Sequence, residues 1–152
     1  MKLVKVSNEF YKKCIKYKTT EELMLNDQGR PCVLIIKLKY KGQKRDFTIP
    51  LRSNIGVSTP KWQYFSLPPN KATKAGNKHG VHYIKIFPVT KHYIDKYNID
   101  GDEFLQMIHK KIMRHEKDII NSCQQYLFDC EEGKKHIMTP NIDGIIKWLD
   151  EE

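Results

Sequence analysis

The segment Cys32–Tyr40 constrains the fold more than any other, because its branched apolar residues run almost without a break and alternate with lysines only at its end. Such a run predicts a central strand that emerges into solvent. Lys41–Lys44 contains a glycine and predicts a hairpin turn, after which Asp46–Leu51 returns as the antiparallel partner. Because Pro50 has no N–H to donate, we expect the chain to leave the sheet at residues 52–54.

Shorter segments flank this hairpin. Lys2–Val6 predicts a strand, and Ser7 is placed to cap a helix that runs to about Tyr17. Residues 56–78 contain three prolines and many polar side chains, which predicts a long basic surface loop. Gly80–Val89 alternates and predicts a further strand.

The last third of the chain is predicted to be helical. Asp100 or Asp102 can cap a helix that continues to about Glu131, with an apolar stripe that includes His115. Thr139-Pro140 begins a last, shorter helix. The expected fold class is α+β: a single domain over residues 1–152, with a strongly twisted antiparallel sheet and flanking helices, one of them long.

Between Asp46 and Asp95 the chain has no acidic residue, yet this stretch holds seven lysines and arginines, three histidines and several aromatic residues. Basic donors interleaved with flat rings suit RNA or single-stranded DNA, whose phosphates attract cations and whose bases stack. Without a carboxylate in this stretch, little is available to hold Mg²⁺ or Zn²⁺. We therefore expect chemistry that needs neither a metal ion nor another cofactor.

The net charge of +9 is unevenly distributed. Residues 1–50 have a net charge of +7, residues 51–100 of +6 and residues 101–152 of −4. An acidic last third indicates one basic face rather than a uniformly basic surface.

The cysteines and the hydropathy of the chain indicate the cellular compartment in which the protein works. The four cysteines form no CxxC pair, so we expect free, reduced thiols. The chain has no apolar run near the roughly 20 residues of a membrane span and no apolar signal-type region at its start, so we expect a cytoplasmic protein without a membrane partner. Motifs for ATP, nicotinamide or zinc-protease chemistry are absent from the sequence.

The bend expected after Pro50 is the first candidate site. Arg52, Ser53 and Asn54 place a guanidinium, a hydroxyl and exposed backbone N–H groups together, and such donors suit a phosphate. The alternative is a simple turn in which Ser53 and Asn54 bond their own backbone.

The segment His79–Lys85 is the second candidate site. His82 could transfer a proton near neutral pH, and Lys85 could stabilise charge on a phosphate in the transition state. Alternate residues of a strand share a face, so these two point opposite ways unless a bulge intervenes. The alternative is a packed histidine and a solvated lysine. Further predicted RNA contacts are Lys61, Trp62, Tyr64, Lys71, Lys74, Lys78, His79, Tyr83 and His109.

Taken in order, these motifs resemble the ToxN/AbiQ family of type III toxin–antitoxin endoribonucleases, including its CptN and TenpN branches. The shared pieces are the strand Pro31–Tyr40, the bend Ile49–Asn54, the strand Gly80–Lys85 and the helix around Arg114–Ile120, within residues 1–130. The family pattern often has Thr or Ser at the position of Arg52 and Lys at that of Ile55, so this chain departs from it twice.

The resemblance implies a barrel-like sheet and a toxin that cuts RNA without metal. The substrate's 2′-hydroxyl attacks the adjacent phosphate and leaves a 2′,3′-cyclic phosphate. It also implies inhibition by a small, repeat-derived pseudoknot RNA that the toxin processes, a toxin–RNA hetero-oligomer, and cellular or phage RNA as the substrate. By position, Ser53 corresponds to the family's active-site serine and Lys85 to its strand lysine, and Arg30 lies near its catalytic lysine.

Ser53, Arg52, Lys85, His82 and Arg30 are therefore the predicted catalytic residues. Two other hypotheses use the same charge pattern. A non-catalytic RNA-binding module would need no reactive site. An RNase toxin could instead be inhibited by an acidic protein, since a basic surface attracts either inhibitor.

Overall fold

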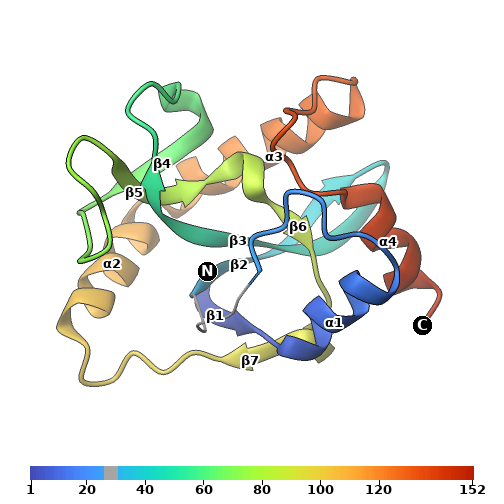
Figure 1. Ribbon diagram of the computed structural model, residues 1–152, viewed down its shortest axis with the longest axis horizontal. Coiled ribbons are helices and arrows are strands. Elements are labelled where there is room, and N and C mark those ends of the chain that lie inside the picture. The colour runs from blue at the N-terminus through green and yellow to red at the C-terminus, as the bar shows by residue number, and fades with distance from the viewer. Residues whose placement is uncertain (26–30) are drawn as a thin grey trace.

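The computed structural model describes residues 1–25 and 31–152 (Figure 1). This part of the chain forms seven strands: β1 (Lys2–Val6), β2 (Cys32–Tyr40), β3 (Gln43–Ile55), β4 (Tyr64–Leu67), β5 (Lys78–His82), β6 (Phe87–Pro88) and β7 (Ile94–Lys96). It also forms four α-helices, α1 (Asn8–Lys16), α2 (Glu103–Arg114), α3 (Glu116–Glu131) and α4 (Ile142–Asp150). Three short 3₁₀ helices are η1 (Lys61–Gln63), η2 (Tyr83–Lys85) and η3 (Lys91–Tyr93).

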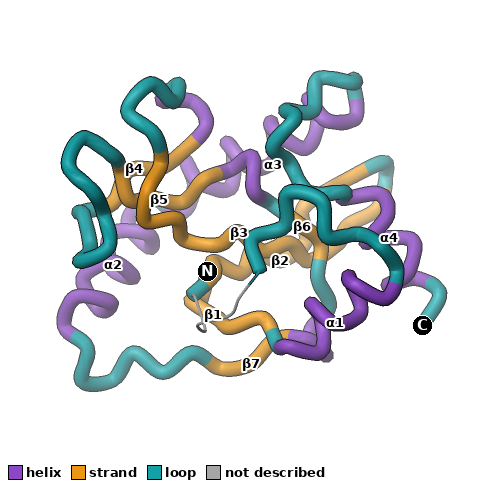
Figure 2. Tube along the Cα trace, in the orientation of Figure 1, coloured by secondary structure: helices purple, strands orange, loops and turns teal. Residues whose placement is uncertain are grey.

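The strands pair antiparallel in the order β4–β5–β3–β2–β1–β7, with β6 also paired to β3. The predicted α+β class is confirmed. Within the described residues β4 and β7 each have one partner strand, so the sheet is open at both edges rather than closed into a barrel. The long strand β3 lies in the centre of the sheet (Figure 2). It pairs with β2 on one side and with β5 and β6 on the other.

The central hairpin is confirmed, but the predicted end of its second strand is wrong. β3 continues through Pro50 to Ile55, so residues 52–54 belong to the strand and not to a bend outside the sheet. On one side β3 pairs with β6 at Phe47 and Thr48 and with β5 from Leu51 onwards. Pro50 lies between these two stretches, where pairing on that side is already interrupted, so the strand tolerates a residue that lacks an N–H.

The predicted single strand over residues 80–89 is also wrong. β5 ends at His82, the 3₁₀ helix η2 follows, and β6 resumes at Phe87. Ile86 N donates to Tyr83 O (3.1 Å) across this turn. Lys85 therefore does not follow the strand alternation that starts at His82.

The long loop predicted over residues 56–78 contains regular structure. Its aromatic segment forms η1 and β4, and β4 pairs with β5 at the edge of the sheet. The remainder, Pro68–Asn77, is a loop that returns to β5. Aromatic residues at 64 and 65 favour a strand, and pairing with β5 stabilises it.

The predicted continuous helix to Glu131 is divided at His115 into α2 and α3. Asp102 is the N-cap of α2, as expected, and its Oδ1 accepts from Leu105 N (3.0 Å). His115 is exposed rather than part of the packed stripe. Because Ile112 and Ile119 lie on either side of this break and both are buried, the break lets two helices pack their apolar faces on one twisted sheet.

The two faces of the sheet are covered by different helices (Figure 1). Leu3, Val33 and Ile49 pack in a core with the apolar residues of α2 and α3. Val4, Val6 and Cys32 alternate with them and pack in a second core with aromatic residues of α1 and α4, including Phe10 and Trp148. Period-two alternation along β1 and β2 accounts for this division.

Two further predictions from the sequence concern the cysteines and the membrane-spanning segments. Cys14, Cys32, Cys123 and Cys130 are free thiols, as expected. Burial raises the pKa of Cys14 to about 11, so its thiolate form is rare at neutral pH. In residues 1–25 and 31–152, no helix has the length and apolarity needed to cross a membrane.

Candidate active site

Ser53 lies in a cavity of about 660 Å³ at the end of the sheet. The cavity is bounded by β3, β5, the loop after β4 and the beginning of α2, and its lining residues include Ser53, Asn70, Lys71, His79, Tyr97, Asp102 and Phe104. Ser53 follows Leu51 on the face of β3 that α2 covers, and Leu51 pairs with Val81 of β5. Strand alternation thus directs Ser53 and His79 to the same side of the sheet.

The loop beside the cavity is held in place by two asparagines. Asn70 Nδ2 donates to Ser53 Oγ (2.8 Å), while Asn70 Oδ1 accepts from Ala72 N (2.9 Å). Asn54 Oδ1 accepts from Lys74 N (2.8 Å). Because Ser53 and Asn54 bond to this loop and not to their own backbone, the simple-turn alternative does not describe the site. The Ser53 hydroxyl accepts from Asn70, which leaves its proton available to donate to a bound oxygen.

His79 is 3% exposed and lines the same cavity. Its Nδ1 lies 2.7 Å from Pro68 O, and its ring stacks on Phe104 at 6.3 Å between centroids. Burial lowers the pKa of His79, so the imidazole is neutral near pH 7.

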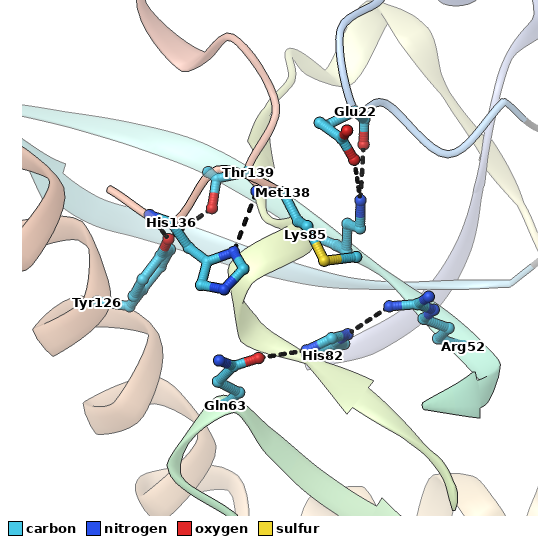
Figure 3. Close-up of polar contacts among 9 residues, drawn as sticks. All are labelled: Glu22, Arg52, Gln63, His82, Lys85, Tyr126, His136, Met138 and Thr139. Atoms are coloured by element: carbon cyan, nitrogen blue, oxygen red, sulfur yellow. Dashed lines mark hydrogen bonds and ion pairs between the residues drawn. The ribbon is translucent and has the colours of Figure 1, made fainter. Parts of the chain in front are cut away.

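Arg52 and His82 lie on the opposite face of the sheet from Ser53. Arg52 pairs with Gly80 in the register of β3 and β5, and its Nη1 contacts His82 Nδ1 at 3.1 Å. His82 Nε2 lies 3.1 Å from Gln63 Oε1. An arginine can only donate, so Nδ1 accepts and Nε2–H donates to Gln63 (Figure 3).

Both ring nitrogens of His82 are therefore engaged, and the side chain is 2% exposed. Burial, followed by the charges of Arg52 and Lys85, lowers the pKa of His82 to about 3. In this arrangement His82 is neutral and both of its ring nitrogens are bonded, and its contact with Nη1 positions the Arg52 side chain. Its proton-transfer role stays a prediction.

Lys85 is 5% exposed and forms an ion pair with Glu22. Its Nζ lies 3.0 Å from Glu22 Oε2 and 3.2 Å from Glu22 O (Figure 3). The 3₁₀ turn η2 directs Lys85 towards the segment after α1, away from the Ser53 cavity. The predicted set of Ser53, Arg52, His82 and Lys85 is thus divided between two faces of the sheet.

Arg30, the fifth predicted catalytic residue, lies outside the described residues. The next residue, Pro31, lines the Ser53 cavity. Leu51 N donates to Pro31 O (3.1 Å), which ties that point of the chain to β3.

The predicted RNA contacts differ in exposure. The lysines are all exposed, namely Lys61, Lys71, Lys74 and Lys78. Trp62 is 58% exposed and rests against Tyr126, and Tyr64 is half-buried. Tyr83 is buried in the core, so the prediction that its ring stacks on a base is wrong. Its position in η2 rather than in a strand turns it inward.

His109 lies apart from the Ser53 cavity. It is half-buried, its Nε2 is 3.4 Å from Met1 O, and it lines a second cavity of about 620 Å³. Lys2, Lys91 and Lys96 also line that cavity, and Tyr97 borders both cavities.

Several site residues were not predicted from sequence. Asn70 orients Ser53, Gln63 orients His82, and the nearby His136 adds slightly to the lowering of the His82 pKa. His136 is half-buried, and its Nδ1 accepts from Met138 N (3.0 Å) (Figure 3). Only Asn70 had a sequence signal, because Asn after Pro68-Pro69 favours a turn. Among the described residues, no three His, Cys, Asp or Glu side chains are grouped so that they could hold a metal ion.

Comparison with known proteins identifies the fold. No protein-family model matches the chain, and no curated protein matches its sequence. A solved structure from a bacterial antiviral system regulated by a processed non-coding RNA matches with a TM-score of 0.65 and 14% identity, over 97% of this chain and 96% of the other. A second, from a bacterial type III toxin–antitoxin system with selective toxin inhibition by a non-coding RNA pseudoknot, matches with a TM-score of 0.68 and 14% identity, over 99% and 96%. The chain thus has the fold of the ToxN toxins of type III toxin–antitoxin systems, the family that its motifs resemble.

Proposed function

We propose that this chain is a metal-independent endoribonuclease, the toxin of a type III toxin–antitoxin system, and that its active site is the Ser53 cavity. One observation carries the proposal: the serine that corresponds to the family's active-site serine lines a cavity of about 660 Å³ in a chain with the toxin fold. A cavity of this size can hold a nucleotide.

The cavity offers donors for a phosphate. The Ser53 hydroxyl can donate to a non-bridging oxygen, and the Lys71 ammonium can stabilise the charge that develops there in the transition state. Asp102 also lines the cavity, but its carboxylate already accepts from Leu105 N as the helix cap. Lys71 replaces Lys85 in the proposed charge-stabilising role, because Lys85 is paired with Glu22 on the other face.

The proposed substrate is single-stranded RNA. Its 2′-hydroxyl attacks the adjacent phosphorus, which leaves a 2′,3′-cyclic phosphate and a 5′-hydroxyl. Exposed lysines around the loop at residues 70–78 attract the phosphate backbone. The exposed ring of Trp62 offers a platform for an unpaired base, which a duplex would not present.

For the inhibitor we favour a small structured RNA, which the toxin would bind and process. The second structural neighbour comes from a system with toxin inhibition by a non-coding RNA pseudoknot, and this chain presents a basic surface to such a partner. Short tandem repeats beside the gene would support an RNA inhibitor. A neighbouring small acidic reading frame would support a protein inhibitor instead.

A non-catalytic RNA-binding module is the second candidate. The observation in its favour is that His82 and Lys85 are buried and already bonded. The two functions differ in what happens to bound RNA, because a binding module leaves it intact.

The deciding experiment is RNA cleavage in excess EDTA with labelled product ends. We expect cleavage to persist and the products to carry 2′,3′-cyclic phosphate and 5′-hydroxyl ends. An RNA with hydrogen in place of the cleavage-site 2′-hydroxyl should bind and remain uncut. Loss of cleavage in EDTA, or 5′-phosphate products, would refute the mechanism, and intact RNA under all conditions would favour the binding module.

A further inference from the structure

His79 combines three properties that no other histidine in the described residues shares. It lines the Ser53 cavity, one ring nitrogen is held by a backbone carbonyl, and the ring is stacked on an aromatic side chain. Both ring nitrogens of His82 have hydrogen-bond partners, and His109 lines the other cavity. These properties set both the protonation and the orientation of the His79 ring.

The tautomer follows from the hydrogen-bond partners. Pro68 O is a carbonyl and can only accept, so His79 Nδ1 carries the proton and donates at 2.7 Å. Nε2 is then the basic nitrogen of the neutral ring. In the described part of the chain, the buried side-chain nitrogens and oxygens without a partner are Ser7 Oγ and Asp46 Oδ1 alone. His79 Nε2 also has no hydrogen-bond partner in this part of the chain, but it is not one of these buried atoms. It therefore remains in contact with solvent.

The ring is also held rigidly. Pro68, whose φ is fixed, supplies the carbonyl, and Phe104 lies at 20° to the imidazole plane. The next residue, Gly80, lies so close to β4 that a Cβ there would be 2.4 Å from Phe65 O. A base whose second nitrogen is fixed by an acceptor is the arrangement that orients imidazoles in nucleophile-activating sites.

The charged and titratable groups that face this cavity with His79 are Lys71, Tyr97 and Asp102. Lys71 comes from the loop after β4, Tyr97 from the segment after β7, and Asp102 from the start of α2. Asp102 is bonded to Leu105 N as the cap of α2. Burial lowers the pKa of His79, and the hydrogen bond with Pro68 O has the smaller, opposite effect.

We propose that His79 is the general base of the RNA cleavage reaction and takes the proton of the attacking 2′-hydroxyl on Nε2. The inference rests on the proposed function. As the proton moves to Nε2, the 2′-oxygen bonds to phosphorus and the bond from phosphorus to the 5′-oxygen breaks. The leaving 5′-oxygen takes a proton from water, and Nε2 returns its proton to solvent. Ser53 and Lys71 hold the phosphate oxygens during this step.

The test uses His79→Asn, in which the amide N–H₂ can still donate to Pro68 O but no basic nitrogen replaces Nε2. His92→Asn is the matched control, because the His92 side chain is 70% exposed and lies outside both cavities. We expect kcat to fall by about 10²–10⁴-fold in His79→Asn. Affinity for the 2′-deoxy RNA and cleavage by His92→Asn should stay at the wild-type level.

Unchanged kcat in His79→Asn would overturn the inference. A fall in kcat matched by an equal loss of affinity for the 2′-deoxy RNA would also overturn it, because His79 would then be a binding residue. A measurement on the wild-type protein does not depend on the variant's folding. The imidazole ¹⁵N spectrum should show the His79 proton on Nδ1 at pH 7. A proton on Nε2 would refute the proposed role of His79 as the general base. If wild-type protein does not cleave RNA at all, the proposed function fails first, so the two failures are distinct.

Discussion

The Arg52 guanidinium lies 3.1 Å from His82 Nδ1, and this contact defines the protonation state of a buried histidine. Arginine supplies only donors, so the imidazole must accept and stay neutral. Gln63 takes the remaining N–H at 3.1 Å. The contact therefore fixes both the tautomer of His82 and the direction of the Arg52 side chain.

Burial of His82, with the Arg52 charge as the next cause, makes stability depend on pH. The pKa of His82 is lowered from 6.5 to about 3, so below pH 6.5 the unfolded chain binds a proton that the folded chain does not. Stability should fall as pH drops from about 6.5 towards 3, by up to roughly 1.4 kcal/mol per pH unit from this one proton. The lowered pKa of His79 adds to the same trend.

Urea unfolding of His82→Gln at pH 7 and pH 5 measures the effect of His82. We expect a shallower pH dependence than in the wild type, because the variant has no proton to bind at this position. His92→Gln, whose side chain is 70% exposed, should keep the wild-type slope. A His82→Gln slope equal to the wild type would show that His82 does not titrate in this range.

Ser53→Ala tests the proposed active site. We expect cleavage to fall by about 10²–10³-fold, the usual effect of removing one donor to transition-state charge. Stability should fall by only about 1 kcal/mol, since the variant loses one hydrogen bond with Asn70. Ser58→Ala, on an exposed turn, is the control. Wild-type cleavage by a folded Ser53→Ala protein would place the active site elsewhere.

Lys85→Met separates a structural role for the ion pair from a catalytic one. We expect cleavage by the folded variant to resemble that of the wild type, because Lys85 is bonded to Glu22 and lies outside the Ser53 cavity. The Glu22 side chain is 44% exposed, so losing the pair should change stability by no more than about 1 kcal/mol. A loss of cleavage as large as that of Ser53→Ala would instead mean that Lys85 leaves Glu22 to reach RNA.

Trp62→Ala should weaken RNA binding. The ring is 58% exposed and supported underneath by Tyr126, with 6.2 Å between centroids, which suits stacking on a base. We expect a loss of roughly 1–3 kcal/mol in binding single-stranded RNA, measured with the 2′-deoxy substrate by fluorescence anisotropy. Val57→Ala changes a residue that is 75% exposed on a nearby turn and should bind normally. Equal affinity in both variants would exclude Trp62 as a stacking platform.

Gly80→Ala tests the tight pairing of β4 with β5 beside His79 and His82. The new Cβ would lie 2.4 Å from Phe65 O, so the strands must separate. We expect a loss of about 1–3 kcal/mol in the free energy of unfolding. Gly56→Ala is the matched control, since its nearest neighbour would be Thr59 Oγ1 at 3.7 Å, and its stability should be unchanged or raised by less than about 1 kcal/mol. Equal stability of both variants would contradict the close strand approach.

Local patterns were sufficient to predict much of the fold. The alternation and branched residues of Cys32–Tyr40 predicted β2, and the glycine turn after it predicted the hairpin with β3. Ser7 was predicted to cap the first helix, and α1 does begin at Asn8, although the Ser7 hydroxyl makes no cap bond. These features depend on residues that are close together in the chain, so the periodicity of the sequence is enough to predict them.

Sequence also determined that the chain carries an acid-free basic segment with Ser53 and His79 in it, and it predicted a basic surface loop over residues 56–78. Only the tertiary structure decided which of these residues meet. Pairing of β3 with β5 placed Ser53 and His79 on one face of the sheet and Arg52 and His82 on the other. The η2 turn directed Lys85 to Glu22, 63 residues away in the chain. Strand register and long-range packing set these contacts, and no local propensity encodes a partner that far along the chain.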